Sequence, residues 1–364
     1  MTSNFSFIHK QFKINGFHYS NEDLLQFASH FVKEGEPYQH EIGDFLHHWL
    51  NDDDFVEVKT SGSTGIPKNL KIKKEAMVNS ALATGDFFNL KSGDTALHCL
   101  PTQFIAGKMM LVRAMILGLE IDIIAPTSKP IFDYNKMYHF CAMIPLQVEN
   151  CLENCSNIKT IIVGGASVSN TLNDKIQSID SDVYETYGMT ETVTHIALKK
   201  LNNLLSLREG TTKQSAKPYF KLLPNISISQ DERDCLVIEA PNLSEEKIIT
   251  NDIVKIHSET EFEWLGRFDN VINSGGLKLF PEQIEAKLKK HISERFFIAS
   301  KPHKTLGEQL ILVVEGNIDT VDISAFSELK KHEKPKHIFT VKQFVETTSG
   351  KIQRKKTLEL ISLS

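Results

Sequence analysis

The run Thr60–Lys68 (Thr-Ser-Gly-Ser-Thr-Gly-Ile-Pro-Lys) holds the densest group of side chains that could do chemistry. Gly62 and Gly65 permit backbone angles that other residues rarely adopt, while the hydroxyls and Lys68 add donors and a cation. Such a loop can wrap phosphate oxygens with backbone N–H groups. A polar turn between two strands has the same composition, so both interpretations stay open. The Walker phosphate-loop pattern does not occur in the chain.

A second segment, Tyr184–Thr192 (Tyr-Glu-Thr-Tyr-Gly-Met-Thr-Glu-Thr), could serve a nucleotide. Tyr187 can stack on a base, the Thr190 hydroxyl can donate to a phosphate, and Glu191 can hold Mg²⁺. Upstream, Ile161–Ala166 is typical of a buried strand that ends in small residues, where a flat ring could approach the backbone. Without a nucleotide, the simpler interpretation of the second segment is a strand end that runs into a loop.

Two later groups combine charges with glycines. An Asp at position 252 precedes Gly266–Asp269 (Gly-Arg-Phe-Asp), and an Asp with an Arg suits the hydroxyls of a ribose, although both are common on surfaces. The pair Gly275–Gly276 indicates a flexible loop. Near the end of the chain, Thr347–Arg354 (Thr-Thr-Ser-Gly-Lys-Ile-Gln-Arg) is rich in cations, for which a solvated basic tail is the simple interpretation.

The elements that must position these segments alternate between short β-rich runs and longer helical patterns, which predicts a layered α/β fold from Phe55 onward. The predicted helices are Lys74–Phe88, Ile105–Leu117 and Val168–Ile179. The predicted strands are Phe55–Thr60, Asn69–Ile72, Ala96–Leu100, Ile121–Ala125, Thr160–Val163 and Asp182–Glu185.

A second pattern begins near Gly266. Pro281–Ile292 has a helix signature, with Pro at the first position, acidic residues early and lysines late. We expect strands at Arg295–Ser300, Gln309–Glu315 and His337–Phe344, and a helix at Ser324–His332. This predicts a small α+β unit, so we place a boundary at Asp269 and expect domains at residues 1–268 and 269–364.

Composition excludes several classes of protein. The 364 residues are 41% hydrophobic and 24% charged, with a net charge of −5, which argues against wholesale disorder and against a polyanion-binding surface over the whole chain. We expect no nucleic-acid partner and no membrane span, since no apolar run is long enough. Five scattered cysteines do not suggest a disulfide framework, and Cys151 with Cys155 reads as a packed pair rather than a zinc site. A cytoplasmic location is therefore expected, and a homo-oligomer stays open.

Taken in order, the four chemical segments resemble the core motifs of the adenylate-forming superfamily of acyl-CoA synthetases, adenylation domains and firefly-type luciferases. The resemblance spans about residues 55–356 and implies a large α/β domain followed by a small mobile α+β domain. It also implies ATP and CoA as co-substrates, Mg²⁺ and a small-molecule carboxylic acid. Within the superfamily the chain looks most like the o-succinylbenzoate–CoA ligases of menaquinone biosynthesis, with a shortened N-terminal part.

The resemblance assigns roles to individual residues. Lys351 would align the attacking carboxylate with the α-phosphate, Thr190 would contact that phosphate, and Glu191 would bind Mg²⁺. Asp269 would be the hinge of the small domain, and the Gly275–Gly276 loop would guide the CoA thiol. The other implied ATP contacts are Ser61, Gly62, Ser63, Thr64, Gly65, Lys68, Gly164, Gly165, Ala166, Tyr187, Gly188, Asp252 and Arg267.

The acid pocket is expected next to the segment Pro101–Gly107, where Phe104 stands in place of the His that this group usually carries. We hypothesise that Arg113, with Lys108 or a water, recognises the aromatic carboxylate, because an idle Arg in an apolar helix would be costly. A structural salt bridge from Arg113, for example to Glu120, is an equal alternative. For His195 a packed or capping role is expected.

Other functions stay open at this point. The chain could ligate another acyl or aryl acid to CoA, or load an acid onto a carrier protein. A luciferase-type monooxygenase shares the motifs, but no residue selects it. A non-catalytic nucleotide-binding relative would not need Lys351, Glu191, Asp252 and Arg267 together.

Overall fold

The computed structural model describes residues 7–59, 69–202, 218–289, 291–316, 323–346 and 352–361. Several residues predicted to bind ATP, and the predicted catalytic lysine, lie outside the described residues: Ser61, Gly62, Ser63, Thr64, Gly65, Lys68 and Lys351. The loop that holds the first six is flanked by the antiparallel pair β3 (Phe55–Lys59) and β4 (Asn69–Lys73).

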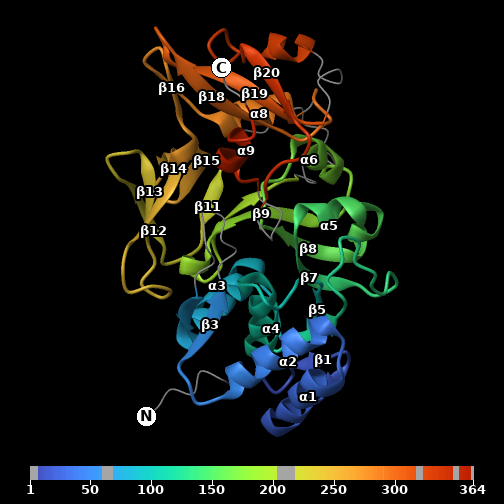
Figure 1. Cartoon of the computed structure of the whole chain (residues 1–364). Helices are drawn as coiled ribbons and strands as arrows, with labels where there is room; N and C mark the ends of the chain where they lie inside the picture. Colours follow the sequence, from blue (N-terminus) through green and yellow to red (C-terminus); the bar gives the residue numbers. More distant parts are fainter. Residues whose placement is uncertain are drawn as a thin grey trace, which may run out of the picture.

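A thirteen-stranded sheet runs through the large part of the molecule (Figure 1). Its order is β12-β13-β14-β15-β11-β10-β9-β8-β7-β5-β6-β1-β2. The parallel half consists of β1 (Lys13–Ile14), β5 (Thr95–His98), β6 (Glu120–Ile123), β7 (Tyr138–Met143), β8 (Ile158–Val163) and β9 (Asp182–Gly188). The antiparallel strands are β2 (Phe17–His18), β10 (His195–Lys200), β11 (Phe220–Leu222), β12 (Ser227–Gln230), β13 (Cys235–Glu239), β14 (Ile248–Ser258) and β15 (Glu261–Arg267).

Helices cover both faces of the parallel half, so its strands are buried on both sides. In β7, Phe140 and Ala142 join one hydrophobic core while Cys141 and Met143 join another, as the two-residue period of a strand requires. The first core packs against α1 (Asn21–Glu34), α2 (Pro37–Leu50), α3 (Lys74–Phe88) and α4 (Ile105–Leu117). The second packs against α5 (Pro145–Asn150), a 3-10 helix at Leu152–Asn157 and α6 (Asn170–Ile176).

The helix bounds follow from local chemistry. α3 and α4 have the predicted ranges, and they end at Asn89 and Gly118, which both adopt left-handed angles that stop a helix. α6 begins later than the predicted Val168 because the Ser169 hydroxyl caps it by accepting from Leu172 N–H, and it ends at Ile176, before the predicted Ile179. No helix in the described ranges is long and apolar enough to cross a membrane.

A five-stranded sheet forms the upper part of Figure 1. It contains β16 (Ile272–Ser274), β17 (Leu277–Leu279), β18 (Phe296–His303), β19 (Gly307–Glu315) and β20 (His337–Val341), with α8 (Pro281–Leu288) and α9 (Arg354–Leu358) packed beside it. The helix predicted at Ser324–His332 is a shorter 3-10 helix in the structure, at Ile323–Glu328. The chain passes from one sheet to the other between Arg267 and Ile272, and the division into two domains stays a prediction.

Candidate functional site

The carboxyl ends of β8 and β9 bring two of the predicted nucleotide segments together. The two strands are parallel and pair as far as Val163 and Glu185, so Gly164 and Tyr187 follow at the same edge of the sheet. Such an edge is where open α/β sheets bind ligands. A Cβ on Gly164 would stand 2.5 Å from Thr186 Oγ1, and Gly165 has φ of +82°, so glycine suits both positions. Gly165 and Ala166 are exposed.

Tyr187, Asp252 and Arg267 form a bonded trio at this edge. The Tyr187 hydroxyl donates to Asp252 Oδ2 at 2.7 Å, and Arg267 Nη1 lies 3.3 Å from Asp252 Oδ1. Asp252 and Arg267 face each other in the β14–β15 pair, so the sheet register sets their spacing. The Tyr187 ring packs on Phe220 and Phe262, and burial raises the pKa of its hydroxyl well above the ordinary value. The trio therefore offers an aromatic wall beside an anchored carboxylate and guanidinium.

The predicted hinge residue belongs to the same ionic network. Asp269 Oδ2 lies 3.7 Å from Arg267 Nη2 and 3.5 Å from Asn251 Nδ2. Asp269 itself lies in a 3-10 turn, Phe268–Asn270, that follows β15. The point where the chain leaves the large sheet is thus connected directly to the Asp252–Arg267 pair.

The loop after β9 carries the predicted phosphate and metal residues. A 3-10 turn spans Thr190–Thr192, with Glu191 exposed and Thr192 fully buried. Within the described residues, no hydrogen bond or ion pair engages the Glu191 carboxylate. An exposed, unengaged carboxylate fits Mg²⁺, which is commonly held by one or two carboxylates together with substrate phosphates. The described ranges contain no cluster of three or more His, Cys, Asp or Glu that could hold a metal alone.

The same loop turns back sharply into β10. Val193 has φ of +64°, and its side chain is buried in the first core with 1% exposed. The backbone N–H of Thr194 donates to the carbonyl oxygen of Thr192 at 2.7 Å, which closes the turn around Val193. Gly188 pairs with His195, and a Cβ on it would stand 2.2 Å from Thr194 O. Gly188 therefore permits the close approach that brings Thr194 and His195 beside the site.

Arg113 lies fully buried on α4, with 1% of its surface exposed. Its Nε donates to Thr84 Oγ1 at 3.3 Å and its Nη2 donates to Thr194 Oγ1 at 3.2 Å. No carboxylate pairs with Arg113 in the portion of the chain that is described, and burial lowers its pKa to about 9. The proposed salt bridge to Glu120 is wrong, because Glu120 pairs with Lys13 and Lys136. The guanidinium is therefore a buried cation, charged at neutral pH, without a protein counter-ion among these residues.

Two further residues were predicted for the acid pocket, Lys108 and Phe104. Lys108 places its ammonium 5.1 Å from the centre of the Phe45 ring on α2, and burial lowers its pKa to about 8. Phe104 is the half-buried residue that precedes α4. Gly275 and Gly276 form the turn of the β16–β17 hairpin, with φ of +58° and +81°.

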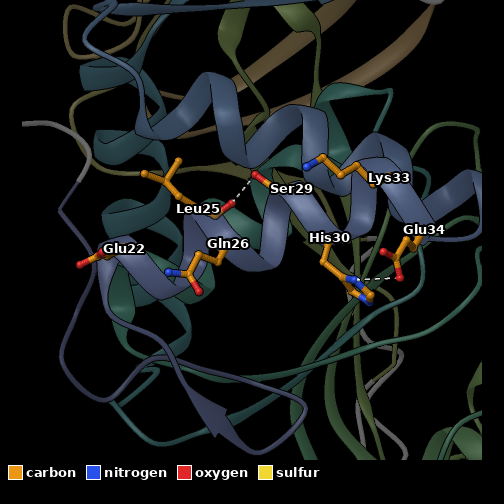
Figure 2. A pocket seen from close by; sticks show the side chains of 7 residues that line it. All are labelled: Glu22, Leu25, Gln26, Ser29, His30, Lys33 and Glu34. Atoms are coloured by element: carbon orange, nitrogen blue, oxygen red, sulfur yellow. Dashed lines mark hydrogen bonds and ion pairs between the residues drawn. The ribbon is translucent and has the colours of Figure 1, made fainter.

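The surface hollow drawn in Figure 2 lies away from this site. It runs along one face of α1 and is lined by Glu22, Leu25, Gln26, Ser29, His30, Lys33 and Glu34. None of the predicted site residues lines it. The sequence prediction also missed residues that the structure adds to the site: Thr84, Thr194, Phe220 and Phe262. The spacing of these residues along the sequence does not indicate that they belong to one site, because only the folded chain brings them together.

Comparisons with known proteins agree on one group of enzymes. Residues 28–229, more than half of the chain, match the family described as AMP-binding enzyme. A 2-succinylbenzoate–CoA ligase of Staphylococcus aureus is 26% identical over 336 residues, which cover 84% of this chain and 67% of that protein.

Solved structures give the same picture. An acyl-CoA synthetase (AMP-forming)/AMP-acid ligase II-like protein from Dyadobacter fermentans is 35% identical, with a TM-score of 0.58, and the match covers 90% of this chain and 95% of that one. The Bacillus subtilis o-succinylbenzoate CoA synthetase in complex with its acyl-adenylate has a TM-score of 0.67 at 19% identity, covering 82% and 68%. The match to the Bacillus subtilis structure shows that the fold is shared. The match to the Dyadobacter fermentans structure covers nearly the full length of both chains.

Proposed function

The chain belongs to the AMP-binding enzyme family, and we propose that it is a ligase that joins o-succinylbenzoate to CoA through an acyl-adenylate. One observation carries the choice of acid: the buried Arg113 cation, which has no protein counter-ion in the described ranges. Because o-succinylbenzoate has two carboxylates, one can be activated while the other neutralises Arg113. The protein would act in the cytoplasm.

Two steps make up the proposed reaction. In the first, an oxygen of the aliphatic carboxylate attacks the α-phosphorus of ATP, and the bond to pyrophosphate breaks. In the second, the CoA sulfur attacks the acyl carbon and AMP leaves with the oxygen that joined them. Both partners of the first step are anions, so fixed positive charge and donors must offset their repulsion.

The nucleotide would lie across the carboxyl ends of β8 and β9. Tyr187 presents an aromatic face for adenine, beside Gly164 whose missing side chain leaves the backbone open. Asp252 and Arg267 are suited to the ribose hydroxyls, since their mutual contact holds both in place. Gly165, Ala166 and Gly188 complete this edge of the sheet.

We assign the phosphates to the loop Ser61–Lys68 and to Thr190. Mg²⁺, held by Glu191 and the phosphates, would supply charge neutralisation when bound. Lys351 would bridge the attacking carboxylate and the α-phosphate, a task that suits a compact ammonium on a long stem. The small domain would turn about Asp269 between the two steps and present Gly275–Gly276 to the pantetheine arm.

Pyrophosphate exchange tests the proposed function. The protein is mixed with ATP, Mg²⁺, labelled pyrophosphate and one acid at a time, and label in ATP is counted before and after CoA is added. We expect exchange with o-succinylbenzoate and thioester only with CoA. Exchange without thioester would replace this proposal with carrier-protein loading, and no exchange with any acid would leave a nucleotide-binding protein.

A further inference from the structure

Three buried side chains and the half-buried Thr194 form a closed polar ring beside the first core. Arg113 on α4 donates to Thr84 on α3 and to Thr194 before β10, as described above. His195 closes the ring, with its Nε2 3.4 Å from Thr84 Oγ1 and its Nδ1 3.4 Å from Thr194 Oγ1. Thr84, Arg113 and His195 are at most 4% exposed. A ring of one cation, two hydroxyls and one imidazole is costly to bury unless every member is oriented.

The hydrogen-bond partners determine where the protons lie. The Thr84 hydroxyl donates to Ser80 O at 2.9 Å, so it can only accept from Arg113 and from His195. His195 must then carry its proton on Nε2, which leaves Nδ1 as an acceptor for the Thr194 hydroxyl. Thr194 in turn directs a lone pair at Arg113 Nη2. Burial and the Arg113 charge lower the pKa of His195 well below its ordinary value, so the ring holds a neutral imidazole.

This proton order leaves part of the guanidinium unused. Arg113 has five N–H donors, of which the ring takes one on Nε and one on Nη2. Nη1 has the Met110 sulfur at 3.9 Å, which is a weak acceptor. The ring therefore orients the guanidinium without neutralising it, because all its acceptors are uncharged.

We propose that His195 and Thr84 are positioning residues that set Arg113 for the second carboxylate of the acid. This inference rests on the proposed function and deepens it: the two residues decide which acids are accepted, through Arg113, without touching the acid. An acidic residue in place of Thr84 or His195 would form an ion pair with Arg113, and the positive charge would no longer be available to the acid substrate. Thr and neutral His hold the cation and leave its charge for the ligand.

Two acids that differ by one group give the test. The first is o-succinylbenzoate and the second is 4-oxo-4-phenylbutanoate, which lacks the ring carboxylate. The ratio of kcat/KM for the two acids is measured by pyrophosphate release for the unaltered protein, His195→Leu, His195→Asn and Thr84→Val. We expect each of His195→Leu and Thr84→Val to lower the ratio roughly tenfold, through KM for o-succinylbenzoate. His195→Asn can still accept from Thr194 and should restore part of the ratio.

Two further variants separate positioning from packing. His98 is a second buried histidine, 1% exposed on β5 and outside the ring, so His98→Leu should leave the ratio unchanged. In an Arg113→Met background, His195→Leu should have no further effect on the ratio. An unchanged ratio in Thr84→Val and His195→Leu, or an equal drop in His98→Leu, would overturn the inference. If the unaltered protein itself shows no preference for o-succinylbenzoate, the proposed function fails instead.

Discussion

A substitution of Arg113 should lower activity without lowering the stability of the fold. A buried cation without a counter-ion costs desolvation free energy, so an apolar side chain of similar volume in its place should not lower the free energy of unfolding. We therefore expect Arg113→Met to unfold at equal or higher urea concentration while kcat/KM for o-succinylbenzoate falls. Arg295, which pairs with Glu315 at the surface, provides the control: Arg295→Met should not change activity. A loss of several kcal/mol in Arg113→Met would mean that Arg113 is a structural ion.

Two buried histidines should control stability toward acid. Burial lowers the pKa of His98 to about 4 and that of His195 well below the ordinary value, so both are neutral in the folded chain. In the unfolded chain they titrate near pH 6.5. The unfolded state therefore binds more protons below that pH, and the stability that is fully present above it falls as the pH decreases.

Urea unfolding at several pH values measures this effect. Each histidine should contribute a slope of up to about 1.4 kcal/mol per pH unit below pH 6.5. His98→Leu should remove one such contribution and leave the His195 contribution in place. If His98→Leu and the unaltered protein lose stability in parallel down to pH 5, His98 is not neutral in the folded state.

At the scale of single elements, Gly188 holds β9 and β10 together at the site. Any Cβ there would meet the Thr194 carbonyl oxygen, which is backbone and cannot move aside without displacing the loop. We expect Gly188→Ala to cost roughly 1–3 kcal/mol and to weaken both ATP and acid binding. Gly93 has φ of +91° with open space around it, so Gly93→Ala should destabilise the chain yet leave KM values unchanged. Equal KM values in the two variants would contradict this role.

The predicted ranges of α3 and α4 agree with the structure, and each helix ends before a residue with left-handed backbone angles, Asn89 and Gly118. The same reasoning predicted no strand between β9 and the small sheet, where β10 to β15 lie. Bulges near His195, Cys235 and Ile253 shift the register in those strands. A shifted register breaks the two-residue alternation by which a strand is recognised.

Some contacts of the candidate site could be predicted from the sequence, and others could not. Tyr187 and Asp252 were assigned through the family motifs, and the structure shows that they touch across 65 positions of sequence. The ring around Arg113 joins residues 29 and 81 positions apart, for which no local spacing rule exists. The packed role expected for His195 describes its burial but missed its bonds to Thr84 and Thr194.

At the scale of the whole molecule, Lys351 is expected to act in adenylation and not in thioester formation. If Lys351 serves adenylation, Lys351→Ala should lower acid-dependent pyrophosphate exchange by about 10²- to 10³-fold, by analogy with the loss of a single oxyanion donor. Thioester formation from synthetic o-succinylbenzoyl-AMP and CoA should proceed at the original rate. Lys355, exposed on α9, is the control, and Lys355→Ala should change neither step. Equal losses in both steps for Lys351→Ala would refute the assignment.

Isotope transfer tests the central claim, which is that the acid is activated as its adenylate. The acid is labelled with ¹⁸O in its aliphatic carboxylate and incubated with the protein, ATP, Mg²⁺ and CoA until thioester has formed. Because thiolysis breaks the bond between the acyl carbon and the bridging oxygen, the account predicts AMP that carries one ¹⁸O atom. Thioester formed together with unlabelled AMP, or with the label in inorganic phosphate, would contradict it.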